Sequence, residues 1–178
     1  MKHFFTLLVF VFACCALSTT ASAQYTAIGA RLGSPISASF KFFPSESAAV
    51  EAFVGFRSNK VNFGNGRAGW TWINVGALYQ IHDDLNLGSV SGLQWYYGGG
   101  ASVYLWSYDN DFPGSEDYGS ATLGLHGNIG LDYTFANAPI NLSVDWVPTF
   151  LIGDGYSTGF GAGYGAFSVR YILNRSGQ

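Results

Sequence analysis

The feature that most constrains the fold is an alternation of large apolar residues with polar or small residues. It is clearest in residues 122–135, where most odd-numbered positions are large and apolar and the even-numbered ones are polar or small. The same period of two recurs in residues 36–42, 50–57, 72–81 and 140–146. A period of two places successive side chains on opposite faces of a β-strand. The chain is therefore predicted to be all-β.

Clusters of Gly, Pro, Asn, Asp and Ser separate the alternating runs, as turns require. The predicted strands cover residues 25–33, 36–42, 48–58, 69–81, 92–108, 121–135, 140–152 and 159–173. No segment shows a helical stripe. Eight antiparallel strands, an even number, place both ends of the domain on the same side.

The composition indicates which solvent the apolar faces meet. Charged residues make up 11% of the chain and aromatic residues 17%, whereas soluble domains carry about 25% charged residues. Beyond residue 23, no run reaches the ~18 consecutive apolar residues of a membrane-spanning helix. Hydrocarbon forces every backbone polar group into a closed ladder. We therefore expect an up-and-down transmembrane β-barrel whose apolar faces contact lipid.

The N-terminus has the pattern of an export signal. Lys2 and His3 precede an apolar run of about 14 residues, too short to cross a bilayer of roughly 30 Å as a helix. Ala21-Ser22-Ala23 then supplies an A-x-A cleavage pattern. Residues 1–23 are predicted to be a cleaved signal peptide, and residues 24–178 the barrel domain.

Both cysteines, Cys14 and Cys15, lie inside the predicted signal peptide. A cysteine just after an apolar segment can be a lipoprotein acceptor, and this alternative stays open. Phe12 fits the acceptor pattern poorly, and the downstream Ala-Ser-Ala favours ordinary cleavage. The predicted mature domain has no cysteine, so it can form neither a disulfide nor a thiolate metal site.

The face opposite the hydrophobic residues carries isolated charges among glycines and serines. These charged residues are Arg31, Lys41, Glu51, Arg57, Asp132, Asp145 and Arg170. An eight-stranded barrel is just wide enough for side chains to fill, so these groups are predicted to pair across the lumen. The glycines at 98–100 and at alternate positions of 159–165 are predicted to mark bulges that shift the facing.

Connection lengths predict the orientation. If both ends are periplasmic, residues 58–68, 109–120 and 153–158 form outer loops, and residues 136–139 form a short inner turn. Aromatic residues gather towards both strand ends, where rings favour the membrane interfaces, although Trp72 and Trp106 have lumen parity. The outer group is Trp70, Trp72, Trp106 and Tyr108, and the inner group is Tyr79, Trp95, Tyr97, Tyr133, Phe135 and Tyr171.

Three segments carry a family resemblance: residues 124–135, 138–146 and 167–171. With the signal peptide and the repeated dyads, they resemble the small outer-membrane β-barrel domain family, similar in architecture to the OmpX, OmpW and OmpA-barrel proteins. The resemblance covers essentially the whole mature chain and implies an eight-stranded barrel in the cell outer membrane. It also implies two partners: the lipid bilayer, and the barrel-assembly machinery during biogenesis.

His126 is the one residue whose type and place suggest chemistry. Its parity puts it in the lumen, where it could act as a general base, although polar filling is the favoured interpretation. A hydrolase also needs a nucleophile and an orienting acid, but the next residue on that face is Asn128. Ser143 and Asp145 could approach it only if the strand register allows. We predict no catalytic, cofactor-binding or metal-binding residues.

Charge excludes one class of partner and leaves others open. The net charge of −3 argues against nucleic acid. The acidic stretch within 109–120 could hold Ca²⁺, but a solvated loop is favoured, and His82-Asp83-Asp84 is interpreted as a turn. An external ligand of unknown identity remains possible at residues 58–68 and 109–120.

The favoured function is a porin-like bacterial membrane protein with a filled lumen and a structural or surface-interaction role, and not an enzyme. One alternative is a narrow pore, or a conduit for small hydrophobic molecules through a lateral opening. Another is a lipid-modifying outer-membrane enzyme. A soluble, lipocalin-like barrel has the same strand count but would place its hydrophobic residues inside; the low charge content disfavours it.

Overall fold

The computed structural model describes residues 25–63, 66–85, 87–88, 90–108, 120–154 and 158–175. The predicted signal peptide, residues 1–23, lies outside them, as do residues 109–119 of the predicted acidic loop. The strands are β1 (Tyr25–Gly33), β2 (Ile36–Ser45), β3 (Ala48–Phe63), β4 (Gly66–Asp84), β5 (Leu93–Tyr108), β6 (Ala121–Thr134), β7 (Ile140–Gly153) and β8 (Gly159–Arg175).

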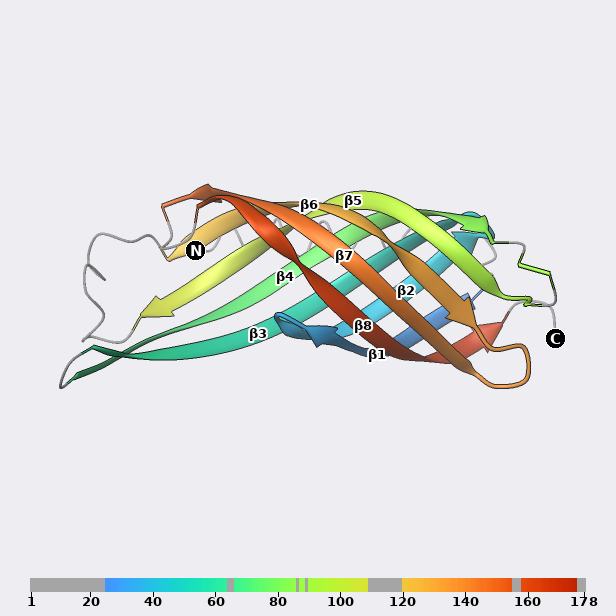
Figure 1. Cartoon of the computed structure of the whole chain (residues 1–178), viewed down its shortest axis with the longest axis horizontal. Helices are drawn as coiled ribbons and strands as arrows, with labels where there is room; N and C mark the ends of the chain where they lie inside the picture. The colour runs from blue at the N-terminus through green and yellow to red at the C-terminus, as the bar shows by residue number, and fades with distance from the viewer. Residues whose placement is uncertain are drawn as a thin grey trace, which may run out of the picture.

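The eight strands form one closed antiparallel barrel in which each strand pairs with its neighbours in sequence (Figure 1). β1 closes the ring against β8, with Tyr25 opposite Arg175 at one end and Gly33 opposite Ala166 further along. We call the Tyr25–Arg175 end the terminal end, and the opposite end the loop end. None of the described residues belongs to a helix long and apolar enough to span a bilayer. The all-β, up-and-down fold predicted from the alternation is confirmed.

The predicted loop at residues 58–68 is wrong. β3 and β4 pair without interruption from Ala48 opposite Ile81 to Phe63 opposite Gly66, so only residues 64–65 separate them. Residues 58–62, Ser-Asn-Lys-Val-Asn, are mostly polar on both faces and show no apolar alternation. Backbone pairing with β4 extends the hairpin where side-chain periodicity gives no signal.

The β1–β2 hairpin, in contrast, ends well before its neighbours at the loop end (Figure 1). The last pairs at this end are Ile36 with Phe56 on the β3 side and Gly33 with Ala166 on the β8 side. Beyond them, residues 57–63 of β3 pair only with β4, and residues 159–165 of β8 pair only with β7. The barrel wall therefore has a lateral gap, bounded by the hairpin tip and by two open strand edges.

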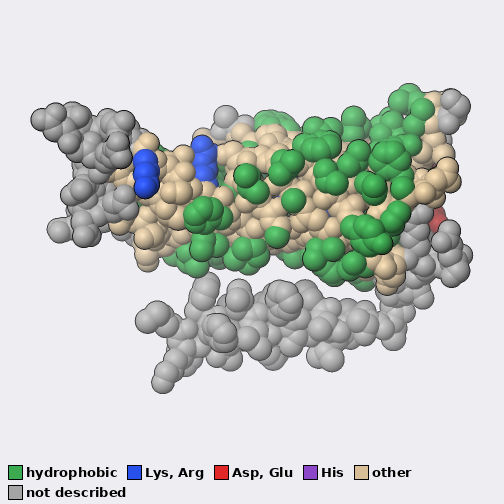
Figure 2. All heavy atoms as spheres, turned by 90° about the horizontal axis from the view of Figure 1, so that it is seen from below, with side chains coloured by type: hydrophobic (Ala, Val, Ile, Leu, Met, Phe, Trp, Pro, Cys, Tyr) green, Lys and Arg blue, Asp and Glu red, His purple; other side chains and the backbone are tan. Residues whose placement is uncertain are grey.

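Burial is inverted relative to a soluble domain. Exposed side chains on the strands are mainly apolar, as in Val54, Leu125 and Val144, and they occur on all eight strands as an apolar belt. On the face seen in Figure 2 they cover the middle of the barrel. The lumen instead buries polar and charged side chains. Among the described residues, the exposed charged side chains are Glu46, Arg57, Lys60, Asp83, Asp84 and Asp154, which all lie near the two ends. The predicted assignment of the strand faces is therefore confirmed, with Arg57 as an exception.

The two predicted bulge regions differ in outcome. In β8 the register shifts opposite Val147–Thr149, and Gly163 has a φ of 76°. Even-numbered side chains therefore face outward before the shift, as in the exposed Phe160, and inward after it, as in the buried Ser168. The predicted bulge in β8 is confirmed. In β5 the pairing with β4 is continuous through residues 98–100, so that predicted bulge is wrong. A Cβ on Gly98 would lie 1.9 Å from the Tyr79 carbonyl oxygen; this glycine permits close backbone approach instead.

Candidate functional site

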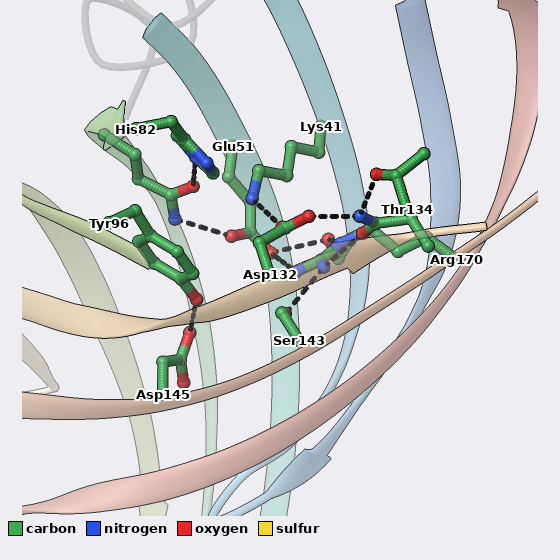
Figure 3. Close-up of polar contacts among 12 residues, drawn as sticks. Lys41, Glu51, His82, Tyr96, Asp132, Thr134, Ser143, Asp145 and Arg170 are labelled. Carbon is green, nitrogen blue, oxygen red and sulfur yellow. Dashed lines mark hydrogen bonds and ion pairs between the residues drawn. The ribbon is translucent and has the colours of Figure 1, made fainter. Parts of the chain in front are cut away.

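The terminal half of the lumen is filled by one network of ion pairs (Figure 3). Its centre is Glu51 on β3, fully buried. Arg170 Nη2 lies 2.6 Å from Glu51 Oε1, and Arg31 Nη1 lies 3.2 Å from the same oxygen. Ser39 and Gln80 also donate hydrogen bonds to this carboxylate, at 2.6 and 3.0 Å. One carboxylate thereby joins side chains from five strands.

Asp145 on β7 forms the second acceptor of the network. Arg31 Nη2 donates to both of its carboxylate oxygens, at 3.1 and 3.0 Å. The Tyr96 hydroxyl donates to Oδ2 at 2.8 Å, and Asn128 donates to the same oxygen at 3.3 Å. Such charge-assisted contacts, here bifurcated from one guanidinium nitrogen, help to hold the buried Arg31 side chain in place.

The third pair is Lys41 with Asp132, at 2.7 Å, close to the terminal end. Lys41 Nζ also lies 4.6 Å from the centre of the Tyr96 ring and 5.0 Å from that of Phe43. Asn141 donates to the other Asp132 oxygen and accepts a bond from Arg170 at 3.2 Å. The three ion-paired units therefore form one continuous layer across the lumen.

Arg57 does not belong to this layer, so its predicted lumen position is wrong. It has the inward parity of β3, but it lies beyond the last β2 pair, at Phe56, and its side chain is exposed. It donates to Ser34 at the tip of the β1–β2 hairpin and to Asn59. Without it, three basic and three acidic side chains remain in the lumen, which balances their formal charges.

An aromatic cluster fills the lumen towards the loop end. It consists of Trp72, Tyr104, Trp106 and Leu151, with Trp70 and Tyr108 packed against it. Trp70, Trp72, Trp106 and Tyr108 were grouped by sequence at the outer interface; the lumen parity expected of Trp72 and Trp106 is confirmed, and Trp70 and Tyr108 pack against the same cluster. At the terminal end, Tyr79, Trp95, Tyr97 and Tyr171 are exposed as predicted.

His126 lies between these two layers and bridges β5 and β7. Its Nε2 lies 2.7 Å from Ser102 Oγ, and its Nδ1 lies 2.8 Å from Thr149 Oγ1. Thr149 donates its own proton to the Val147 carbonyl, so it accepts from Nδ1–H and leaves Nε2 to accept from Ser102. The register places Ser143 opposite Asp132 and Asp145 opposite Gly130. The register therefore does not bring Ser143 or Asp145 to His126, a possibility that the sequence left open, and Thr149 occupies the place that an orienting acid would take.

The terminal mouth of the barrel contains an open cavity of about 430 Å³. Tyr25 and Phe43 stack at its wall with ring centres 4.0 Å apart, and the 82–84 segment contributes to the lining. Within the described part of the chain, no group of three or more His, Cys, Asp or Glu residues could hold a metal ion. The interpretation of 82–84 as a turn is wrong, because these residues are the last of β4 and pair with β5.

No family model and no curated protein sequence matches the chain. Among solved structures, the chain is similar to Neisserial surface protein A (NspA), with a TM-score of 0.54 and 14% identity over 83% of this chain and 91% of that one. It is also aligned with Ail, the attachment invasion locus protein of Yersinia pestis, solved with the heparin analogue sucrose octasulfate. That alignment has a TM-score of 0.48 and 9% identity over 84% of this chain and 94% of that one. The chain has the fold of a small eight-stranded outer-membrane β-barrel.

Proposed function

We propose that this protein is an integral barrel of the bacterial outer membrane, with a structural or surface-interaction role and without catalytic activity. The observation that carries the proposal is the inverted burial. Large apolar side chains such as Ile28, Val54 and Leu125 are about half exposed, whereas Lys41, Glu51 and Arg170 are buried. Water would favour the opposite arrangement, and a surrounding hydrocarbon layer accounts for it.

The filled lumen favours the structural role over a pore. The ion-pair layer around Glu51 and the aromatic cluster around Trp72 follow one another along the barrel axis. Water or solute crossing the lumen would have to displace paired charges and packed rings together. We therefore propose a lumen that does not conduct ions.

The surroundings of His126 support a non-catalytic role. Its hydrogen-bond partners, Ser102 and Thr149, are buried, and no carboxylate among the described residues is hydrogen-bonded to it. A hydrolase requires an accessible nucleophile and an orienting acid. The proposed task of His126 is to join β5 to β7 within the lumen.

The proposed partners follow from the location. The bilayer contacts the apolar belt, and barrel-assembly machinery acts during biogenesis. Nucleic acid is not a proposed partner, given the net charge of −3. An external ligand would meet the loop end, where the extended β3–β4 hairpin projects; residues 109–119 lie outside the described part of the chain.

The test is fractionation of cells that express the full chain, followed by electrophoresis of the membrane fraction with and without boiling. Recovery in the outer membrane with a heat-dependent change of mobility is expected. A soluble periplasmic product without a mobility change would overturn the proposal in favour of a secreted, ligand-carrying barrel. Planar-bilayer recordings of the purified barrel should show no discrete conductance steps; reproducible steps would establish the pore alternative.

A further inference from the structure

The lateral gap between β3 and β8 combines two surfaces that need different surroundings. On its edges, the β2-facing backbone of residues 57–63 and the β1-facing backbone of residues 159–165 have no strand partner. Where these edges project beyond the apolar belt, water can satisfy their backbone groups, but next to the rim such groups cannot face hydrocarbon without a large cost. The part of the gap that borders the rim therefore needs a polar partner.

The rim of the same gap is strongly apolar. Phe160 on β8 and Ile36 beside the hairpin tip are 70% and 64% exposed, the two most exposed large hydrophobic side chains in the described part of the chain. Phe56 on β3, the last residue paired with β2, is also exposed. The rim therefore needs an apolar occupant directly next to the polar one.

Positive charge lies at the same place. Arg57 and Lys60 follow Phe56 on the open edge of β3, and both side chains are exposed. Basic side chains are visible where the hydrophobic belt ends on the side of the β3–β4 tip (Figure 2). The Arg57 guanidinium donates from Nε to Asn59 and from Nη1 to Ser34. Because a guanidinium has five N–H donors, it has further donors with which to contact an anion.

The lumen behind the gap does not admit a chain-like molecule. The cavity below the hairpin tip, lined by Pro35, Phe53, Tyr164 and others, has a volume of about 30 Å³, which is roughly the space of one water molecule. The hydroxyl groups of Tyr104 and Tyr164, which both line this cavity, form a hydrogen bond of 3.1 Å. An occupant must therefore lie along the gap from outside.

We propose that the lateral gap binds an outer-leaflet lipid with a phosphate-bearing head. The phosphate contacts Arg57 and Lys60, the head satisfies backbone groups of the open edges, and an acyl chain covers Phe56 and Phe160. This inference rests on the proposed membrane location and adds a lipid class to it. A lipid whose head and acyl chain join at the gap can contact the polar edges, the apolar rim and the basic side chains at once. A purely polar or purely apolar ligand cannot.

The experiment titrates the folded full-length mature barrel, in micelles of a neutral detergent, with dioctanoyl phosphatidic acid. Binding is followed through the backbone amide resonances of residues 57–63 and 159–165. The test variant is Arg57→Gln/Lys60→Gln. The matched control is Ser107→Asp/Ser120→Asp, which lowers the net charge equally but on β5 and next to β6, across the ring from the gap.

We expect the test variant to bind at least tenfold more weakly and the control to stay within twofold of the parent. Equal binding by parent and test variant would overturn the proposal, as would perturbation only of resonances outside the two edges. Inorganic phosphate that saturates the same resonances at the same concentration would indicate a free-anion site instead. If neutral dioctanoylglycerol bound as tightly as phosphatidic acid, the phosphate would make no contribution to binding and the proposal would be overturned.

The lipid assignment is also contradicted if an extended peptide pairs specifically with either open edge in the presence of phosphatidic acid. The failure of this inference is separable from that of the proposed function. A chain that is recovered in the outer membrane with a heat-dependent mobility, yet ignores phosphatidic acid, disproves only the lipid site.

Discussion

Arg170 Nη2 lies 2.6 Å from Glu51 Oε1 and so connects β8 to β3, two strands that are separated by β1 and β2 in the sheet. Both side chains are fully buried. Arg170 also donates to Ser39, Asn141 and Ser143. The pair therefore braces the barrel across its interior, independently of the backbone ladder.

Replacing Arg170 with Met should destabilise the folded barrel by about 3–5 kcal/mol, because it leaves a buried carboxylate short of its closest cation. Urea unfolding of the barrel in lipid vesicles, followed by gel mobility, measures this change. The double variant Glu51→Gln/Arg170→Met should lose less stability than the sum of the single variants. Additive losses would show that the two side chains do not interact.

Ser168 offers a contrasting test in the same layer. Its side chain is fully buried, and its Oγ has no hydrogen-bond partner among the described residues. Ser168→Ala should therefore be neutral or slightly stabilising, because it removes an unsatisfied polar group. The matched change Ser39→Ala should cost about 1–3 kcal/mol, since Ser39 donates to Glu51 and accepts from Arg170. A comparable loss in both variants, measured by the same unfolding assay, would contradict the network.

Gly100 should tolerate no side chain. A Cβ there would lie 2.0 Å from the Ala77 carbonyl oxygen, which is rigid backbone of β4. Gly100→Ala should destabilise the barrel by about 1–3 kcal/mol through overpacking. At Gly165, a Cβ would meet its nearest neighbour at 3.7 Å, so Gly165→Ala serves as the tolerated control. The fraction of heat-modifiable protein after refolding measures both, and equal yields would contradict this prediction.

Val144 tests the outward face of the barrel. It lies in the exposed belt on β7, opposite Leu131 and Phe167. Val144→Arg should impair membrane assembly, since an arginine near the bilayer midplane costs about 2–4 kcal/mol. Val144→Ile is the control. Equal accumulation of both variants in the outer membrane would show that this side chain does not face lipid.

Alternation predicted strand faces well where one face is apolar. In residues 122–135 and 140–146 the buried and exposed positions follow the predicted parity, and Arg170 lies inward as expected. It failed beyond Phe56, because residues 58–62 have no apolar face, although their backbone continues to pair with β4. Periodicity reports what each face contacts, not where pairing ends.

The contents of the lumen were predicted as a set but not as pairs. Arg31, Glu51 and Asp145 all carry inward parity, yet the choice of partners depends on strand register and barrel tilt, which no single strand encodes. The outer aromatic group shows the same limit. Trp72 and Trp106 follow lumen parity, and interface preference of aromatic rings, a statistical rule, pointed the other way.

The ion-pair layer also constrains when the molecule can fold. Arg31 and Asp145 are 114 residues apart, and Ser39 and Arg170 are 131 apart. Contacts of such long sequence separation form slowly, since the loop-closure entropy is lost before they stabilise anything. Glu51 receives its nearest cation only after the last strand is in place. Until β8 has been added, the chain holds unpaired strands and unmatched charges, so closure of this barrel is a late event in folding.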